Sequence, residues 1–289
     1  MISSVYSYMK RRHLNYSTTL LLLFSTVSTL LLSTHSIAAQ NDQFSKMAYV
    51  DSIMSTFQIE YCCSSTTDKC IKEKPQCTIA EHLYKFADWL STFNAPTDSI
   101  LKYLTIRYES FADTTICDID TANLQRAGKA DAPITIVTFV SANCPACKRS
   151  IGDLYDSVTI GGLNGKAKLY AKMYGGGIGN KALVAALAEG TFWKLFLALR
   201  HRRGLLKEEK DVLSLADSLG IASKSFRSRL NAPVTEQRLA AFKKEGKRLK
   251  IKYTPAIFIN GKKYMSHKRA HWVTDAVLYE MERSKAAAR

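Results

Sequence analysis

The sequence predicts an α/β domain that is preceded by a small, cysteine-rich α-helical module. A β-branched and aromatic run without breakers, residues 134–140, indicates a buried strand, and a helical pattern follows it. Residues 249–264 indicate two further strands around an Asn-Gly turn. The chain has 289 residues, of which 46% are hydrophobic and only 6 are proline, and this globular composition excludes disordered, collagen-like and proline-rich classes.

The N-terminal 39 residues have the pattern of an export signal. Basic residues at 10–12 precede an apolar run at 20–32, and small residues at 36–39 follow it. The apolar run is shorter than the roughly 20 residues that span a bilayer. We therefore expect residues 1–39 to be a cleavable signal peptide and the mature chain to be periplasmic or secreted, where disulfides persist. An uncleaved signal anchor is the alternative.

Charge divides the mature chain into two parts. Residues 40–120 carry a net charge of −5, and residues 121–289 carry +18. The change coincides with Gly128 and Pro133, so we expect a cysteine-rich helical hairpin module at 40–120 and an α/β domain at 121–289. Nucleic acid is not an expected partner, because no recognition motif accompanies the basic residues. A solvated surface is the default for them, and contact with an anionic surface is the alternative.

The first strand of the α/β domain leads into the residues that carry chemistry. A short turn follows the strand, and the next residues are Cys144-Pro145-Ala146-Cys147. Pro145 suits the first position of a helix, where its missing N–H costs nothing. Cys144 therefore lies at a helix N-terminus, and the unpaired N–H groups and the helix dipole there favour a thiolate, which is the nucleophilic form. Cys147 lies one turn further and can close a disulfide with Cys144.

The C-x-x-C motif has two alternative interpretations. A C-x-x-C is half of a zinc site, but no second C-x-x-C or H-x-x-H accompanies it, so we expect no metal. An inert structural disulfide is the second alternative. The strand–turn–helix setting and the export signal favour a redox-active dithiol.

A second feature lies more than 100 residues downstream. Residues 249–264 predict a strand, a turn at Asn260-Gly261 and a second strand. Pro255 is disfavoured in a central strand unless it begins the strand or follows an unusual peptide bond.

Trp193 and Trp272 are expected in the core. Helices are predicted at residues 182–188, 191–199, 212–219, 236–249 and 271–283.

These two features together resemble the DsbA-like branch of the thioredoxin superfamily. The resemblance extends over about residues 121–286, and its motifs are Asp131-Ala-Pro-Ile-Thr-Ile-Val, the C-P-A-C dithiol, and Thr254-Pro255-Ala-Ile-Phe-Ile-Asn-Gly261. It implies a thioredoxin fold with a DsbA-type helical insertion and a central sheet of four or five strands. It also implies that Cys144 is the exposed nucleophile and Cys147 the resolving thiol. Pro255 would be the cis-proline, and Thr254 would offer backbone groups to an extended substrate.

Two departures from that family bear on its redox direction. The family often has a buried carboxylate six residues before the first cysteine, and this chain has Thr138, so water or a lysine must accept the proton. The strongest oxidants of the family have histidine between the cysteines, where this chain has Ala146. Loss of the imidazole should make Cys144 less acidic and the disulfide less oxidising. Oxidation, reduction and isomerisation therefore all stay open.

The acidic module contains five further cysteines, which we expect to form structural disulfides. Two bridges leave one thiol over, and adjacent cysteines rarely bond to each other. A second redox relay that exchanges electrons with the C-P-A-C dithiol is one alternative, and a metal site is another, although the spacing suits zinc poorly. The five cysteines are Cys62, Cys63, Cys70, Cys77 and Cys117.

Two amphipathic helices, at residues 79–93 and 97–108, predict a helical hairpin between these cysteines. About fifty residues of this module weakly resemble the helical hairpin of the cytochrome c maturation protein CcmH. That family has a C-x-x-C at the start of the hairpin, which this chain lacks, so the redox role of that family does not transfer.

The sequence thus predicts an exported protein disulfide oxidoreductase that exchanges disulfides with envelope or secreted proteins through its C-P-A-C dithiol. No cofactor is expected. The implied partners are protein or peptide thiols and disulfides, with a DsbB-like or DsbD-like membrane partner. The alternative is a non-enzymatic thioredoxin-fold binding protein, which docks an apocytochrome or a metal-handling partner through the cysteine-rich module. Substrate, disulfide connectivity and oligomeric state are not specified by these residues.

Overall fold

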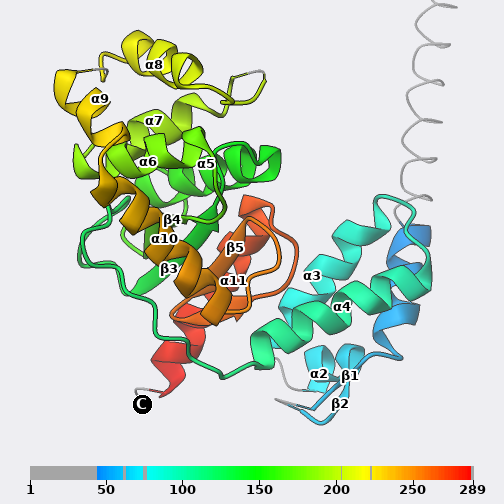
Figure 1. Ribbon diagram of the computed structural model, residues 1–289. Coiled ribbons are helices and arrows are strands. Elements are labelled where there is room, and N and C mark those ends of the chain that lie inside the picture. Colours follow the sequence, from blue (N-terminus) through cyan, green and yellow to red (C-terminus); the bar gives the residue numbers. More distant parts are fainter. Residues whose placement is uncertain (1–43, 61–62, 74–76, 203, 222, 288–289) are drawn as a thin grey trace, which may run out of the picture.

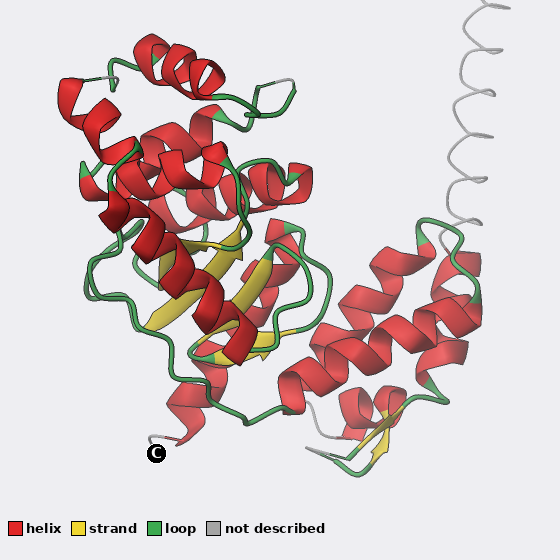
Figure 2. Cartoon of the chain, viewed as in Figure 1, coloured by secondary structure: helices red, strands yellow, loops and turns green. Residues whose placement is uncertain are grey.

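A four-stranded mixed sheet forms the centre of the C-terminal part of the chain (Figures 1 and 2). The computed structural model describes residues 44–287 except 61–62, 74–76, 203 and 222. The strands occur in the order β4-β3-β5-β6, with β3 parallel to β4 and antiparallel to β5, and β5 antiparallel to β6. Their bounds are β3 Ile134–Val140, β4 Ala167–Met173, β5 Ala256–Ile259 and β6 Lys262–Tyr264. The predicted strands are therefore present.

The two faces of the sheet bury different side chains. Along β3, Ile136 and Val140 belong to the main core, together with residues of α5 (Pro145–Thr159) and α11 (Ala270–Ala287). Val137 and Phe139 point the opposite way into a second cluster, because successive strand residues alternate between faces. Helix α10 (Pro233–Arg248) packs on β4. The sheet is thus covered by helices.

A helical insertion connects β4 to β5. Its helices are α6 Ile178–Ala188, α7 Phe192–Ala198, α8 Glu209–Ser218 and α9 Lys224–Leu230, and α10 follows them. Trp193 is only 3% exposed and its indole N–H donates to the Gln125 carbonyl at 2.9 Å, while Trp272 on α11 is 7% exposed. The expectation that both tryptophans belong to the core is confirmed. The predicted α/β class and helical insertion are also confirmed.

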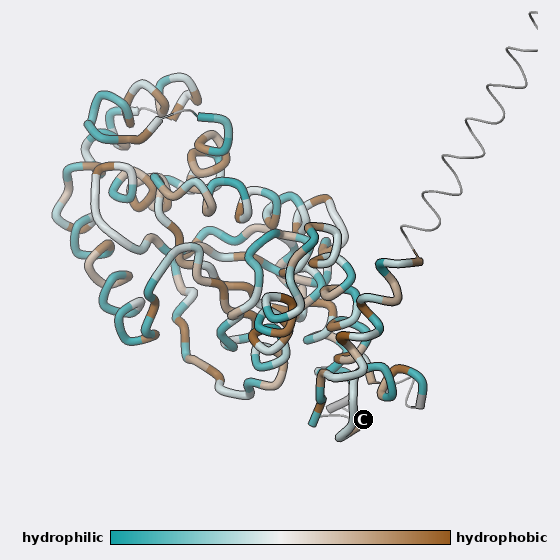
Figure 3. The backbone as a smooth tube through the Cα atoms, turned by 90° about the vertical axis from the view of Figure 1, so that its right-hand side faces the viewer, coloured by the Kyte–Doolittle hydropathy of each residue, from teal (hydrophilic) through white to brown (hydrophobic). Residues whose placement is uncertain are grey.

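The acidic part of the chain is a small helical module with a short hairpin. It contains a helix at residues 44–54, α2 Thr67–Glu73, α3 Thr78–Ser91 and α4 Thr97–Ala112, with β1 Gln58–Ile59 and β2 Ser65–Thr66. Helices α3 and α4 are the predicted pair, and the two-residue strands were not predicted. Along the tube of Figure 3, hydrophobic and hydrophilic positions alternate in the helices, as amphipathic helices that cover a core require.

A buried arginine joins this module to the C-terminal part. Arg107 of α4 is fully buried, and its guanidinium lies 4.7–4.9 Å from three ring centroids, including those of Phe86 and Trp272. It forms an ion pair with Asp275 of α11 and donates to the Tyr264 hydroxyl at 3.2 Å. The two parts therefore share one continuous core. The division of the chain at residue 120 stays a prediction.

Within the described residues, no helix is both long and apolar enough to cross a bilayer. The predicted signal peptide, residues 1–39, lies outside the described residues.

Candidate active site

The loop after β3 places Cys144 at the start of α5. Cys144 is the N-cap residue of this helix and has an extended backbone, with φ −83° and ψ 112°, and Pro145 follows at the first helical position. The backbone N–H of Cys147 donates to Sγ of Cys144 at 3.2 Å. The sulfur thus accepts one of the free N–H groups of the first turn, as an N-cap side chain does.

This environment separates the acidities of the two thiols. Hydrogen bonds from the Cys147 thiol and from Thr254, aided by the backbone N–H groups of Cys147 and Ala146, lower the pKa of Cys144 to about 5 despite partial burial. Cys147 is fully buried, and this burial, followed by its hydrogen bond to Cys144, raises its pKa. Cys144 is therefore a thiolate at neutral pH, and Cys147 is a protonated thiol in the reduced protein.

The loop before β5 lies directly against this sulfur. The Thr254–Pro255 peptide bond is cis, as the resemblance implied, and β5 begins at the next residue. The carbonyl oxygen of Thr254 lies 3.4 Å from Sγ of Cys144, although the two residues are 110 apart in the chain. The fold thus brings together Cys144, Cys147, Thr254 and Pro255, and their catalytic and substrate-binding roles stay predictions.

Thr138, which lies on β3 six residues before Cys144, has a hydroxyl and no carboxylate. Its side chain is fully buried on the same face of β3 as Ile136 and Val140, and its hydroxyl has no hydrogen-bond partner among the described residues. The lysine that directly follows Cys147, Lys148, lies on the first turns of α5 and is 8% exposed. Burial and the nearby Arg202 lower its pKa, and the Cys144 thiolate opposes that shift.

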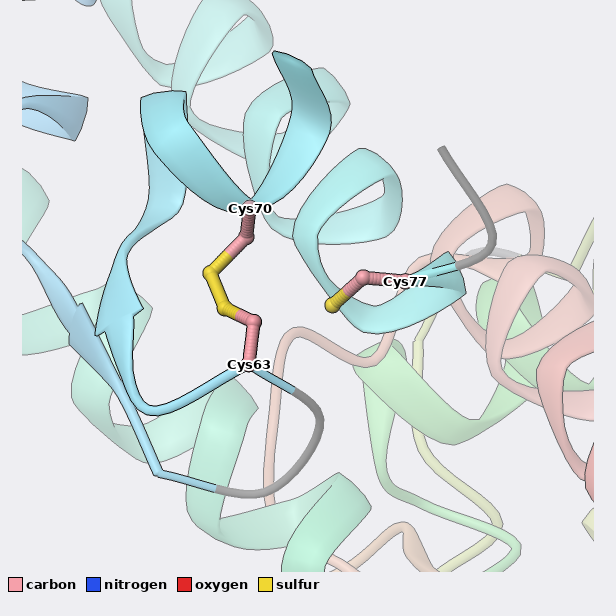
Figure 4. A group of neighbouring side chains, drawn as sticks. All are labelled: Cys63, Cys70 and Cys77. Carbon is pink, nitrogen blue, oxygen red and sulfur yellow. A yellow bond between two sulfur atoms is a disulfide. The ribbon is translucent and has the colours of Figure 1, made fainter. Parts of the chain in front are cut away.

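Three cysteines of the acidic module, Cys63, Cys70 and Cys77, are oxidised. Cys63 and Cys70 form a disulfide, and the sulfur of Cys77 lies within 4.8 Å of both (Figure 4). Cys77 is also disulfide-bonded. Cys70 and Cys77 are 1% and 3% exposed, which agrees with a structural role and makes them poor partners for a relay. Cys62 lies outside the described residues.

Cys117 corrects one expectation, because it is a free, half-buried thiol rather than part of a disulfide. Its backbone N–H donates to the Gly261 carbonyl at 2.9 Å, so the chain has left the acidic module and runs along the β5–β6 turn. Gly261 has φ +78°, and a Cβ there would lie 2.7 Å from the Cys117 carbonyl oxygen. The absence of a side chain at Gly261 therefore lets this segment lie against the β5–β6 turn, and Cys117 is a thiol outside the disulfides.

Sequence reasoning missed the residues that fix the wall beside Cys144. The Asn143 side chain donates to the Leu206 carbonyl at 3.0 Å and accepts from the Leu206 N–H at 2.8 Å. Lys148 and Arg202 lie on this same side of the dithiol. The position of Asn143 directly before Cys144 was the only local signal, and the pairing with Leu206 depends on the insertion.

Comparisons with known proteins place the C-terminal part. The family model described as thioredoxin matches residues 121–277. No curated protein sequence matches the chain. Similar solved structures include a thioredoxin-like oxidoreductase from Silicibacter pomeroyi (22% identity, 60% of this chain, 97% of that chain, TM-score 0.48) and the catalytic domain of Proteus mirabilis ScsC (18%, 63%, 98%, 0.49). A third is BdbD from Bacillus subtilis, with 19% identity over 59% of this chain and 99% of that chain and a TM-score of 0.48.

Proposed function

Because the chain belongs to the thioredoxin family as a DsbA-like member, we propose that it is an exported thiol–disulfide oxidoreductase in which Cys144 and Cys147 exchange disulfides with envelope or secreted proteins. One observation carries the proposal. The Cys144 sulfur accepts the N–H of Cys147 at the start of α5, and the carbonyl of Thr254 from the cis-proline loop lies 3.4 Å away. A thiolate held beside a resolving thiol and a free backbone edge is suited to disulfide exchange.

The reaction proceeds in two displacements when the protein acts as oxidant. A substrate thiolate attacks Sγ of Cys144 in the Cys144–Cys147 disulfide, that bond breaks, and a mixed disulfide forms between the substrate and Cys144. The departing Cys147 sulfur takes a proton. A second substrate thiolate attacks the substrate sulfur of the mixed disulfide, and Cys144 leaves as a thiolate. The substrate gains a disulfide, the protein gains two electrons, and the second proton goes to solvent.

The unequal acidities of the two thiols support this direction and this order of events. The pKa of Cys144, about 5, makes it the better leaving group in the second displacement, because lower thiol pKa speeds departure. It also stabilises the reduced protein, which makes the disulfide more oxidising. Cys147 is fully buried and Cys144 is not, so a substrate meets Cys144 first. We therefore propose net transfer of disulfides to substrates, with Ala146 making the protein a weaker oxidant than histidine there would.

The cis-proline loop supports a mode of substrate binding. Thr254 and Pro255 precede β5, and Tyr253 beside them is 57% exposed. An extended substrate chain can pair with backbone groups of this exposed loop, and its cysteine then lies next to Cys144. Binding through the backbone accepts many sequences, which suits an enzyme that acts on several protein thiols. A DsbB-like membrane partner would return the dithiol to the disulfide.

Trapping the mixed disulfide tests the proposal. The Cys147→Ala variant, made together with Cys117→Ala to remove the remaining free thiol, is incubated with a disulfide-bonded peptide and analysed by mass spectrometry. We expect one peptide adduct on Cys144, because no resolving thiol is left to release it. The matched control, Cys144→Ala with Cys117→Ala, should form none. Absence of an adduct on Cys144, or an equal adduct in the control, would refute the proposal.

A further inference from the structure

We propose that a basic pocket beside the dithiol binds the carboxylate of an acidic side chain that neighbours the substrate's cysteine. This inference rests on the proposed function and adds a sequence preference to it. The pocket has a volume of about 280 Å³ and is bounded by Asn143 and Pro145, the two neighbours of Cys144 in the chain. Four basic side chains line it, namely Lys148, Arg149, Arg200 and Arg202.

The wall of the pocket is fixed by hydrogen bonds. The paired hydrogen bonds between Asn143 and Leu206 tie the dithiol loop to the segment that follows α7. Leu206 is 2% exposed, so this tie is anchored in the core. Nζ of Lys148 donates to the Gly204 carbonyl at 3.5 Å across the same segment. Lys148 and the segment opposite it are therefore held in place before any ligand arrives, which reduces the entropic cost of binding.

The charges of the pocket are only partly balanced. Arg200 is paired with Asp153 and Asp156 of α5, so it contributes little net charge. Arg202 has a single carboxylate, at 3.9 Å, and its buried Nε has no acceptor among the described residues.

Two further cations have no carboxylate partner among the described residues. Among the described residues, no carboxylate oxygen lies within 4.0 Å of Lys148 or Arg149. Lys148 is 8% exposed and lines the pocket, so the pocket is the side from which a ligand reaches it. A buried cation without a counter-ion is costly, and an incoming carboxylate relieves that cost.

The position of the pocket determines the kind of ligand. The substrate's sulfur bonds to Cys144, and one residue of extended chain spans about 3.3 Å. A side chain one or two residues from the substrate's cysteine can thus reach a pocket that begins at Asn143 and Pro145. Lys148 also attracts the Cys144 thiolate, so the pocket has the strongest positive field when Cys144 is in a disulfide. An acidic substrate is therefore attracted to the oxidised protein and released from the reduced one.

Paired peptides test this preference. Two dithiol peptides that differ only by Glu or Gln next to one cysteine are mixed with the oxidised protein, and the reaction is quenched with acid and measured by mass spectrometry. Each rate is divided by the rate of the same peptide with a small aromatic disulfide, because Glu itself changes the acidity of the neighbouring thiol. We expect the Glu peptide to react about three- to tenfold faster at low salt, with the ratio falling towards one as salt is added.

A charge-matched pair of variants locates the effect. Arg149 is exposed and lines the pocket, whereas Lys243 is exposed on α10 outside it. Arg149→Gln should lower the ratio of the two peptides towards one, because it removes one of the pocket's unbalanced cations, and Lys243→Gln should leave the ratio unchanged. Loss of the ratio in both variants would show a long-range field and overturn the pocket. Equal rates for both peptides in the natural chain would also overturn it while leaving the proposed function intact. No exchange with either peptide would refute the proposed function itself.

Discussion

The thiol of Cys147 should control the pKa of Cys144. Replacing this thiol shows how much of the lowered pKa is due to its hydrogen bond and how much to the position of Cys144 at the helix N-terminus. The Cys147 thiol is the largest cause that lowers the pKa of Cys144 to about 5. A hydrogen bond to a charged group is worth about 1.5–3 kcal/mol, which is about one to two pKa units. Cys147→Ala should therefore raise the pKa of Cys144 to about 6–7. Cys147→Ser keeps a donor and should leave it near the natural value.

The assay is the pH dependence of alkylation. Each variant has Cys117→Ala as well, reacts briefly with iodoacetamide between pH 3 and pH 9, and is digested so that mass spectrometry reports modification of Cys144 alone. The half-maximal rate marks the pKa, because only the thiolate reacts. Equal midpoints for the Ala and Ser variants, or a natural midpoint near the ordinary value of 9.0, would refute the reasoning.

The remaining predictions concern stability. Arg107→Ala removes one of the two buried partners of the Asp275 carboxylate, the other being His82, and should lower the free energy of unfolding by about 3–5 kcal/mol in urea titration; a loss below 1 kcal/mol would contradict the burial argument. Thr138→Val removes a buried hydroxyl that lacks a partner and should raise the same quantity by about 1 kcal/mol, whereas a comparable loss would show that the hydroxyl is satisfied. Cys63→Ser with Cys70→Ser opens a bridge of sequence separation 7 and should lower stability by about 2.5 kcal/mol, measured by thermal unfolding; no change would make that disulfide dispensable. The reduced protein should gain stability as pH rises from about 5 towards 9 and lose it as pH falls through 5, because folding lowers the pKa of Cys144; a flat difference between reduced and oxidised forms in pH-dependent urea titrations would contradict this.

The sequence contained the local part of the active site. A strand, a turn and Pro145 at the first helical position place Cys144 at a helix N-terminus, because each step depends only on neighbouring residues. The resemblance supplied Pro255 and its cis bond. The two predicted helices of the acidic module were also readable, because their apolar spacing follows the helical period.

Contacts between distant segments were not predictable in the same way. The 3.4 Å approach of the Thr254 carbonyl to Cys144, the ties between Asn143 and Leu206, and the burial of Arg107 among aromatic rings all depend on tertiary packing. Arginine is usually a solvated surface residue, so its sequence position does not predict that Arg107 is buried. The packing of α4 against α11 buries it. The expected disulfide of Cys117 is absent, and the sequence does not show that the chain has left the acidic module at this residue.

The redox equilibrium of the purified protein with glutathione tests the central claim most directly. Thioredoxin and DsbA have nucleophile pKa values of about 7 and 3.5 and potentials of about −270 and −120 mV. A pKa of about 5 therefore predicts a potential between these two values. Mass spectrometry of each cysteine should show one reversible two-electron couple at that potential, confined to Cys144 and Cys147, with Cys63 and Cys70 unchanged. A potential below that of thioredoxin, or a couple located in the acidic module, would contradict the account.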